Sequence, residues 1–135
     1  MSRSVALAGL VWSAGLVSAH AVGPKLDCQN AQTQADMNQC AGLDLANADQ
    51  ALNKQWTLTR SAMVETDANQ DTGLKGAEKA LLKAQRAWID YRDGQCEAEG
   101  FAVRGGSMEP LVVAACKTRL TQQRTEELKS LTESQ

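Results

Sequence analysis

Four cysteines are the residues of this 135-residue chain with the most clearly defined chemistry. They stand at Cys28, Cys40, Cys96 and Cys116, without the C-x-x-C spacing of redox-active pairs. Cysteines pair in oxidising compartments, so we predict structural disulfides rather than a catalytic dithiol. Four cysteines allow three pairings, and the sequence alone does not choose among them. The predicted helices favour Cys28–Cys40 and Cys96–Cys116, because each pair then lies on neighbouring segments.

Neighbouring carboxylates offer a second kind of chemistry, because paired acids cleave glycosidic bonds. The candidate pairs are Asp90 with Asp93 and Glu97 with Glu99, but acids this close on one helix usually form a solvated face. The one histidine, His20, falls in or next to the predicted leader described below. The folded body would then lack the usual general base and any free thiolate. We predict that the protein is not an enzyme and holds no metal or cofactor.

Two arginines, Arg92 and Arg124, have side chains that bind anionic ligands or link helices through ion pairs. We expect helix-linking ion pairs for both. Asp90 and Asp93 are poorly placed to pair with Arg92 on the same helix, so we expect its partners on another helix, near Arg124 or Glu127.

The glycine-rich stretch 100–107 is a predicted loop. Residues 105–107 have the composition of a phosphate-binding turn, but the rest of that motif is absent, and we expect a plain loop with a helix cap. Loops on a rigid scaffold often carry binding residues. Arg104, Ser107 and Glu109 are therefore the predicted interface residues, with Arg104 able to reach into an acidic cleft.

The elements that position these residues are three predicted helices with no sheet, because aromatic and β-branched runs are scarce. A long amphipathic helix spans about 33–64 and begins at Thr33 with capping-box spacing. A break near Gly42 is the alternative, but the apolar stripe continues across it. Helices at about 74–99 and 107–130 form an antiparallel hairpin. The predicted fold class is all-α, with two disulfides.

The aromatic residues of these helices fall on the apolar stripes. Trp56, Trp88 and Tyr91 recur at helical spacing with neighbouring apolar residues, which predicts core positions. The alternative for Trp88 and Tyr91 is a platform on which sugar rings stack.

The first residues, 1–21, have the features of a cleaved signal peptide. They combine a basic start, an apolar stretch too short to span a membrane, and an A-x-A signal at 19–21. Cleavage after Ala19 is the alternative. We expect one domain, 22–135, in the periplasm or secreted. Cys28 lacks the small preceding residues of a lipid-attachment signal.

The charge pattern bears on the partner. The chain has 14 basic and 16 acidic residues, and the two signs are interspersed. This is a poor footprint for nucleic acid or anionic lipid, so we predict neither nucleic-acid binding nor membrane insertion. A weakly acidic protein suits a basic partner. The sequence does not indicate an oligomeric state.

Several short motifs occur in a fixed order along the chain. They are Cys28, Ala31, Thr33-Gln34, Met37-Asn38, Cys40, Ala48-Asp49, Leu52-Asn53, the block 84–96 with Trp88, Tyr91, Arg92 and Cys96, Gly105-Gly106-Ser107-Met108, Cys116, Leu120-Thr121, Arg124-Thr125 and Leu128. In this ordered combination, the chain resembles the LprI-like lysozyme inhibitor family of small exported bacterial proteins, over about 28–128. The resemblance implies an all-helical, disulfide-bonded domain that binds and blocks a lysozyme, a basic enzyme with an acidic cleft. The founding inhibitor is a lipoprotein, which this chain is not predicted to be. The alternative is an envelope interaction protein or a binder of cell-wall fragments.

Overall fold

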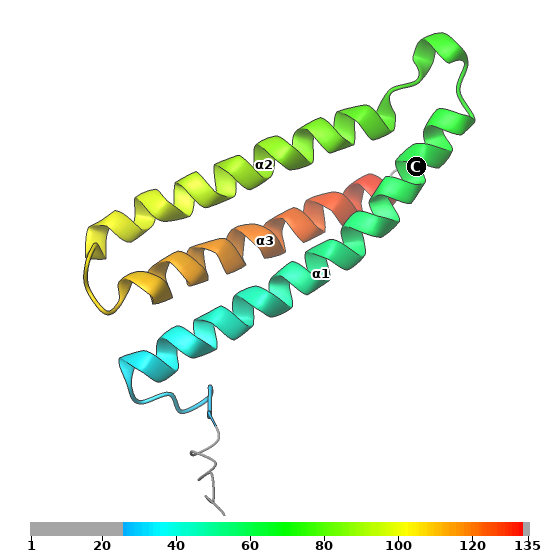
Figure 1. Ribbon diagram of the computed structural model, residues 1–135. Coiled ribbons are helices and arrows are strands. Elements are labelled where there is room, and N and C mark those ends of the chain that lie inside the picture. The colour runs from blue at the N-terminus through cyan, green and yellow to red at the C-terminus, as the bar shows by residue number, and fades with distance from the viewer. Residues whose placement is uncertain (1–25, 134–135) are drawn as a thin grey trace, which may run out of the picture.

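The structure is a computed structural model that describes residues 26–133, and these residues form an all-α fold (Figure 1). Three long helices pack side by side, with α2 antiparallel to α1 and to α3. The three-helix prediction is confirmed. The predicted signal peptide lies outside the described residues. In chain order the elements are α1 (Gln34–Ala68), η1 (Thr72–Leu74), α2 (Ala77–Gly100), η2 (Phe101–Val103) and α3 (Glu109–Glu133).

Helix α1 begins where the capping pattern predicts. The hydroxyl of Thr33 accepts a hydrogen bond from the backbone N–H of Asp36 at 3.1 Å, which satisfies one of the free donors of the first turn. The helix passes through Gly42 without a break and continues to Ala68, beyond the predicted end at residue 64. One continuous helix, rather than two, therefore spans the length of the bundle.

Helix α2 begins at Ala77, so the predicted start near Leu74 is wrong. Leu74 belongs to the short η1 turn and is 71% exposed. The reason is a cap supplied from α1: the carboxylate of Asp67 accepts from the N–H groups of Gly76, Ala77 and Glu78 at 2.7, 2.8 and 3.1 Å. Because these free donors meet Asp67, the helix starts there.

Helix α3 begins at Glu109, two residues after the predicted cap at Ser107. Pro110 stands in the first turn, where no intrahelical N–H is needed, as predicted. Ser107 instead contributes its carbonyl, which accepts from Asn38 Nδ2 of α1 at 2.9 Å. The helix continues to Glu133, so it is longer than the sequence predicted.

Both disulfides have the predicted pairing, Cys28–Cys40 and Cys96–Cys116. The second is part of the core: Cys96 is fully buried and packs with Cys116 and Leu120. It fixes the end of α2 to the start of α3. The larger apolar cluster lies towards the other end of the bundle and consists of Leu52, Met63, Leu81 and Leu128, with Trp56, Ala77 and Trp88 packed against it.

Candidate functional site

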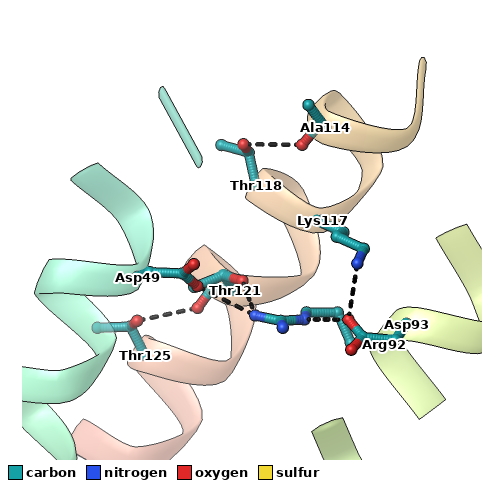
Figure 2. A network of polar contacts seen from close by, with 8 residues as sticks. All are labelled: Asp49, Arg92, Asp93, Ala114, Lys117, Thr118, Thr121 and Thr125. Carbon is teal, nitrogen blue, oxygen red and sulfur yellow. Dashed lines mark hydrogen bonds and ion pairs between the residues drawn. The ribbon is translucent and has the colours of Figure 1, made fainter. Parts of the chain in front are cut away.

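Arg92 is the centre of a polar layer that joins all three helices (Figure 2). Its Nη1 donates to Asp49 Oδ1 of α1 at 3.0 Å and to Thr121 Oγ1 of α3 at 3.3 Å, while its Nε donates to Asp93 Oδ1 at 3.0 Å. The guanidinium also lies over the Trp88 ring, 5.2 Å from its centroid. Only 15% of the Arg92 side chain is exposed. These contacts engage the Arg92 guanidinium, so Arg92 links the three helices and is not free to bind a ligand.

The prediction that Arg92 reaches another helix is confirmed, but the predicted partners are wrong. Asp93, its sequence neighbour, does bond to it, contrary to the prediction that same-helix acids are poorly placed. Lys117 Nζ of α3 also approaches Asp93 Oδ1 at 3.1 Å. Partial burial raises the pKa of Asp93, but the hydrogen bonds and charges of Lys117 and Arg92 outweigh it, and the net pKa lies below its ordinary value.

Arg124 also makes contacts that stabilise the helical bundle. Its Nε donates to Gln85 Oε1 of α2 at 3.1 Å, and its Nη1 pairs with Glu127 Oε2 on its own helix at 3.0 Å. Gln85 is buried, so this bond satisfies an amide that would otherwise be costly inside the bundle. Like Arg92, Arg124 is not positioned as a free anion-binding group.

Of the predicted core aromatics, Tyr91 lies on the surface. It is 56% exposed, so the core prediction is wrong for this residue. Trp88, Arg92 and Cys96 share the face of α2 that turns inwards, and Tyr91 precedes Arg92 by one position, about 100° around the helix axis. Trp88 is half-buried and packs against the main apolar cluster, as Trp56 does.

The loop between α2 and α3 is held by several contacts at its base and along its length. Gly100 has no side chain, and a Cβ placed there would come within 2.7 Å of Val113 Cγ2, so glycine permits the close approach of the two helices. Gly105 has a φ of 75°, and its N–H donates to Glu109 Oε2 at 2.7 Å. Together with the bond from Asn38 to Ser107, these contacts fix the loop against α1 and α3.

Arg104 is the most prominent charged residue of this loop. Its guanidinium carbon lies 4.5 Å from the centroid of the Phe101 ring. Its Nη1 is 3.4 Å from Glu109 Oε1 and 3.9 Å from Glu97 Oε1. The structure thus brings together two predicted interface residues, Arg104 and Glu109, as an ion pair, and Ser107 lies between them in the loop.

Two residues that the sequence reasoning did not select stand beside these. Phe101 is 59% exposed and Met108 is 47% exposed, on either side of Arg104 in the chain. The available signal was the occurrence of a large apolar residue inside a glycine-rich stretch without helical periodicity. We call Phe101, Arg104 and Met108 the loop surface.

Three of the four acids considered for glycoside cleavage are engaged in ion pairs, and Asp90 has no ion-pair partner among the described residues. Asp93 joins the Arg92 layer, Glu99 pairs with Arg119 at 3.0 Å, and Glu97 approaches Arg104. Within residues 26–133, no group of three histidine, cysteine, aspartate or glutamate side chains is placed to hold a metal ion.

None of the helices in this described range is long and apolar enough to span a bilayer.

The fold and the loop together define a small all-α, disulfide-bonded protein with an ordered loop at one end of its helical bundle. Residues 27–128 match the family model described as "Lysozyme inhibitor LprI", and the chain belongs to this family. It is 52% identical over 119 residues to an uncharacterized protein of Rhizobium meliloti (strain 1021), a match that covers 86% of each chain. No solved structure matches the chain significantly. The family resemblance seen in the sequence is confirmed.

Proposed function

We propose that this protein is an exported, non-catalytic inhibitor that binds a lysozyme with its loop surface and so blocks the substrate cleft. Membership of an inhibitor family supports the general activity. The observation that carries the mechanism is the ordered loop next to the buried Cys96–Cys116 disulfide, with Phe101, Arg104 and Met108 facing solvent.

The composition of the loop surface supports binding to a protein. Aromatic residues, methionine and arginine are enriched at protein interfaces, and aromatic residues and arginine are enriched among the residues that dominate binding energy. Because the loop is already fixed by Gly105, Glu109 and Asn38, its ordering costs little free energy on association. Arg104 is positioned to meet the carboxylates of an acidic cleft.

Export to the periplasm or beyond is part of the same proposal. The predicted signal peptide at residues 1–21 would direct it, and two disulfides suit an oxidising compartment. Lysozyme acts on the cell wall, so an inhibitor must be located outside the cytoplasm to meet it.

The direct test is a lysozyme turbidity assay with the purified, oxidised protein. We expect inhibition that saturates near equimolar ratios, and Arg104→Ala to weaken it by about tenfold, the scale of an interface hot spot. Arg86→Ala is the matched control, because Arg86 is exposed on α2, away from the loop. Absence of inhibition at large molar excess overturns the proposed function.

A double variant separates the loop from the rest of the molecule. Arg104→Ala with Glu109→Ala removes both members of the loop ion pair. If the variant keeps its helical circular dichroism and both disulfides, and still inhibits like the parent protein, then the loop surface is not the inhibitory site.

A further inference from the structure

An open groove of about 350 Å³ lies between the N-terminal halves of α1 and α3. Most of its exposed lining is apolar, and the Cys28–Cys40 disulfide forms part of it. Asn38 of α1 bonds to Ser107, so the groove lies at the same end of the bundle as the loop surface. The apolar side chains that line it are Ala31 before α1, Met37 and Ala41 of α1, and Leu111 and Ala115 of α3.

This end of the molecule also carries an excess of negative charge. The Asp49–Arg92–Thr121 layer is a natural boundary, and the end half consists of residues 26–48 and 93–120. This half contains seven carboxylates and three cationic side chains, whereas eight of each lie in the described residues on the other side of the layer. The charges of the end half are Asp27, Asp36, Asp44, Asp93, Glu97, Glu99 and Glu109 against Arg104, Lys117 and Arg119.

The carboxylates of the end half that no described cation pairs with lie on the α1 side, and one of them, Asp44, lines the groove. All three cations of the end half pair with acids of α2 or α3, including Arg119, which lines the groove and bonds to Glu99. No cation among the described residues pairs with Asp27, Asp36 or Asp44, which all lie on the α1 side.

Two of these carboxylates, Asp36 and Asp44, lie on the face of α1 that borders the groove. Asp36, Cys40 and Asp44 follow one another at four-residue steps, so they lie along one face of α1. Cys40 and Asp44 both line the groove. An apolar floor therefore adjoins a row of carboxylates that form no ion pair with a described cation, since Arg119, the cation of the lining, pairs with Glu99.

We propose that this groove receives a basic segment of the partner protein, with one apolar side chain on the floor and a lysine or arginine beside Asp36 and Asp44. The charge argues for a basic occupant and against a second copy of this chain, because two copies would bring the same carboxylates together. The identification of the partner with lysozyme, a basic enzyme, rests on the proposed function. The chemistry of the groove does not.

The first experiment tests the groove without lysozyme. Capped Leu-Lys-Leu, Leu-Gln-Leu and Leu-Glu-Leu peptides are titrated into the isotopically labelled protein, and the resonances of Met37 and Ala115 are followed by NMR. We expect weak binding in the order lysine, glutamine, glutamate, with the difference reduced in Asp44→Asn. Absence of shifts at the groove, or equal binding of the three peptides, overturns the proposal.

The second experiment uses a basic animal lysozyme and matched pairs of variants, with calorimetric binding and inhibition as readouts. Asp44→Asn is paired with Asp90→Asn, since both are exposed carboxylates without an ion-pair partner among the described residues. Ala115→Leu, which fills the groove, is paired with Ala87→Leu on the exposed face of α2. We expect affinity to fall about threefold for Asp44→Asn and at least about tenfold for Ala115→Leu, with both controls unchanged.

The outcomes separate the two proposals. If the parent protein inhibits lysozyme and the groove variants behave like their controls, the groove proposal is overturned while the proposed function stands. If the parent protein does not bind lysozyme, the proposed function falls and the peptide titration decides the groove. Sedimentation showing a dimer that Ala115→Leu dissociates would assign the groove to a second copy and overturn the proposal. Circular dichroism of every variant excludes unfolding, and the conservative Asp44→Asn keeps the test valid if Ala115→Leu fails to fold.

Discussion

Asp67 caps a helix that it does not belong to. A helix is usually capped by the residue just before its first turn, but Gly76 stands there in α2 and has no side chain to contribute. The carboxylate of Asp67, at the end of α1, instead accepts three backbone hydrogen bonds from the first residues of α2. We predict that Asp67→Ala speeds hydrogen exchange at Gly76, Ala77 and Glu78 and lowers the melting temperature. Asp71→Ala, in the same connection, is the control, and equal exchange in both variants would contradict the cap.

The same residue makes stability depend on pH. Backbone hydrogen bonds from Gly76, then Ala77, then Glu78 lower the pKa of Asp67 below its ordinary value of 3.8. A carboxyl with a lowered folded-state pKa stabilises the fold fully above the unfolded-state pKa, and this stabilisation is lost as pH falls through the folded-state value. We predict that the free energy of unfolding falls below about pH 4, and less steeply in Asp67→Ala than in the parent protein. Urea unfolding measured from pH 7 to pH 2 checks the two slopes.

Arg92 shows how one side chain can join three helices. Its bonds to Asp49, Asp93 and Thr121 are charge-assisted, and its side chain is largely buried. We predict that Arg92→Ala destabilises the protein by about 2 kcal/mol, because it removes charged hydrogen bonds and leaves acceptors unpaired. Chemical denaturation measures this. Exposed Arg86→Ala should change stability by less than about 0.5 kcal/mol, and similar losses in the two variants would contradict the bridging role.

At the scale of elements, α1 and α3 are joined by a hydroxyl pair inside the bundle. Thr59 of α1 is fully buried, and its Oγ1 lies 2.9 Å from the Leu128 carbonyl and 2.9 Å from Thr132 Oγ1, both of α3. We predict that Thr59→Val, which keeps the shape, costs about 1 kcal/mol through the lost hydrogen bonds. The control is Thr57→Val on the exposed side of the same helix, where Thr57 bonds only within α1. Equal free energies of unfolding for the two variants would show that the interhelical bond is not stabilising.

The sequence was sufficient to predict the three helices because their existence depends on local patterns. The Thr33 cap, the continuous apolar stripe across Gly42 and the spacing of the cysteines are patterns among residues close in the sequence, so the sequence alone reveals them. The start of α2 was missed because it depends on Asp67, a contact between elements. The exposure of Tyr91 was missed because a stripe of apolar residues can be wider than the face that the neighbouring helices cover.

The candidate site was predicted less completely than the fold, for the same reason. Arg104, Ser107 and Glu109 are selected by their predicted position in a loop; Arg104 and Ser107 lie in the loop before α3, whereas Glu109 is the first residue of α3. The stacking of Arg104 on Phe101 and the groove between α1 and α3 both arise from tertiary packing, which no local pattern encodes. Residues that form a surface together with residues of other helices can be identified only from the tertiary structure.

At the scale of the whole molecule, the two disulfides fix different parts of the same end. Cys96 is fully buried and Cys116 nearly so, whereas Cys28 is exposed to solvent. A reductant reaches a disulfide only through an exposed sulfur, so we predict that mild reduction opens Cys28–Cys40 first. Mass spectrometry of alkylated samples, taken along a reductant titration, reports the order. Simultaneous opening of the two disulfides would contradict it.

The functional consequence follows from what each bridge holds in place. Removing either disulfide lowers the free energy of unfolding by about 3 kcal/mol on the loop-entropy model. Cys96–Cys116 fixes the helices on both sides of the loop surface, while Cys28–Cys40 fixes only the segment before α1 and one part of the groove. We therefore expect Cys96→Ala with Cys116→Ala to lose lysozyme inhibition, and Cys28→Ala with Cys40→Ala to retain it with weakened affinity. Equal inhibition by the two double variants, both shown to be folded by circular dichroism, would separate inhibition from the ordering of the loop.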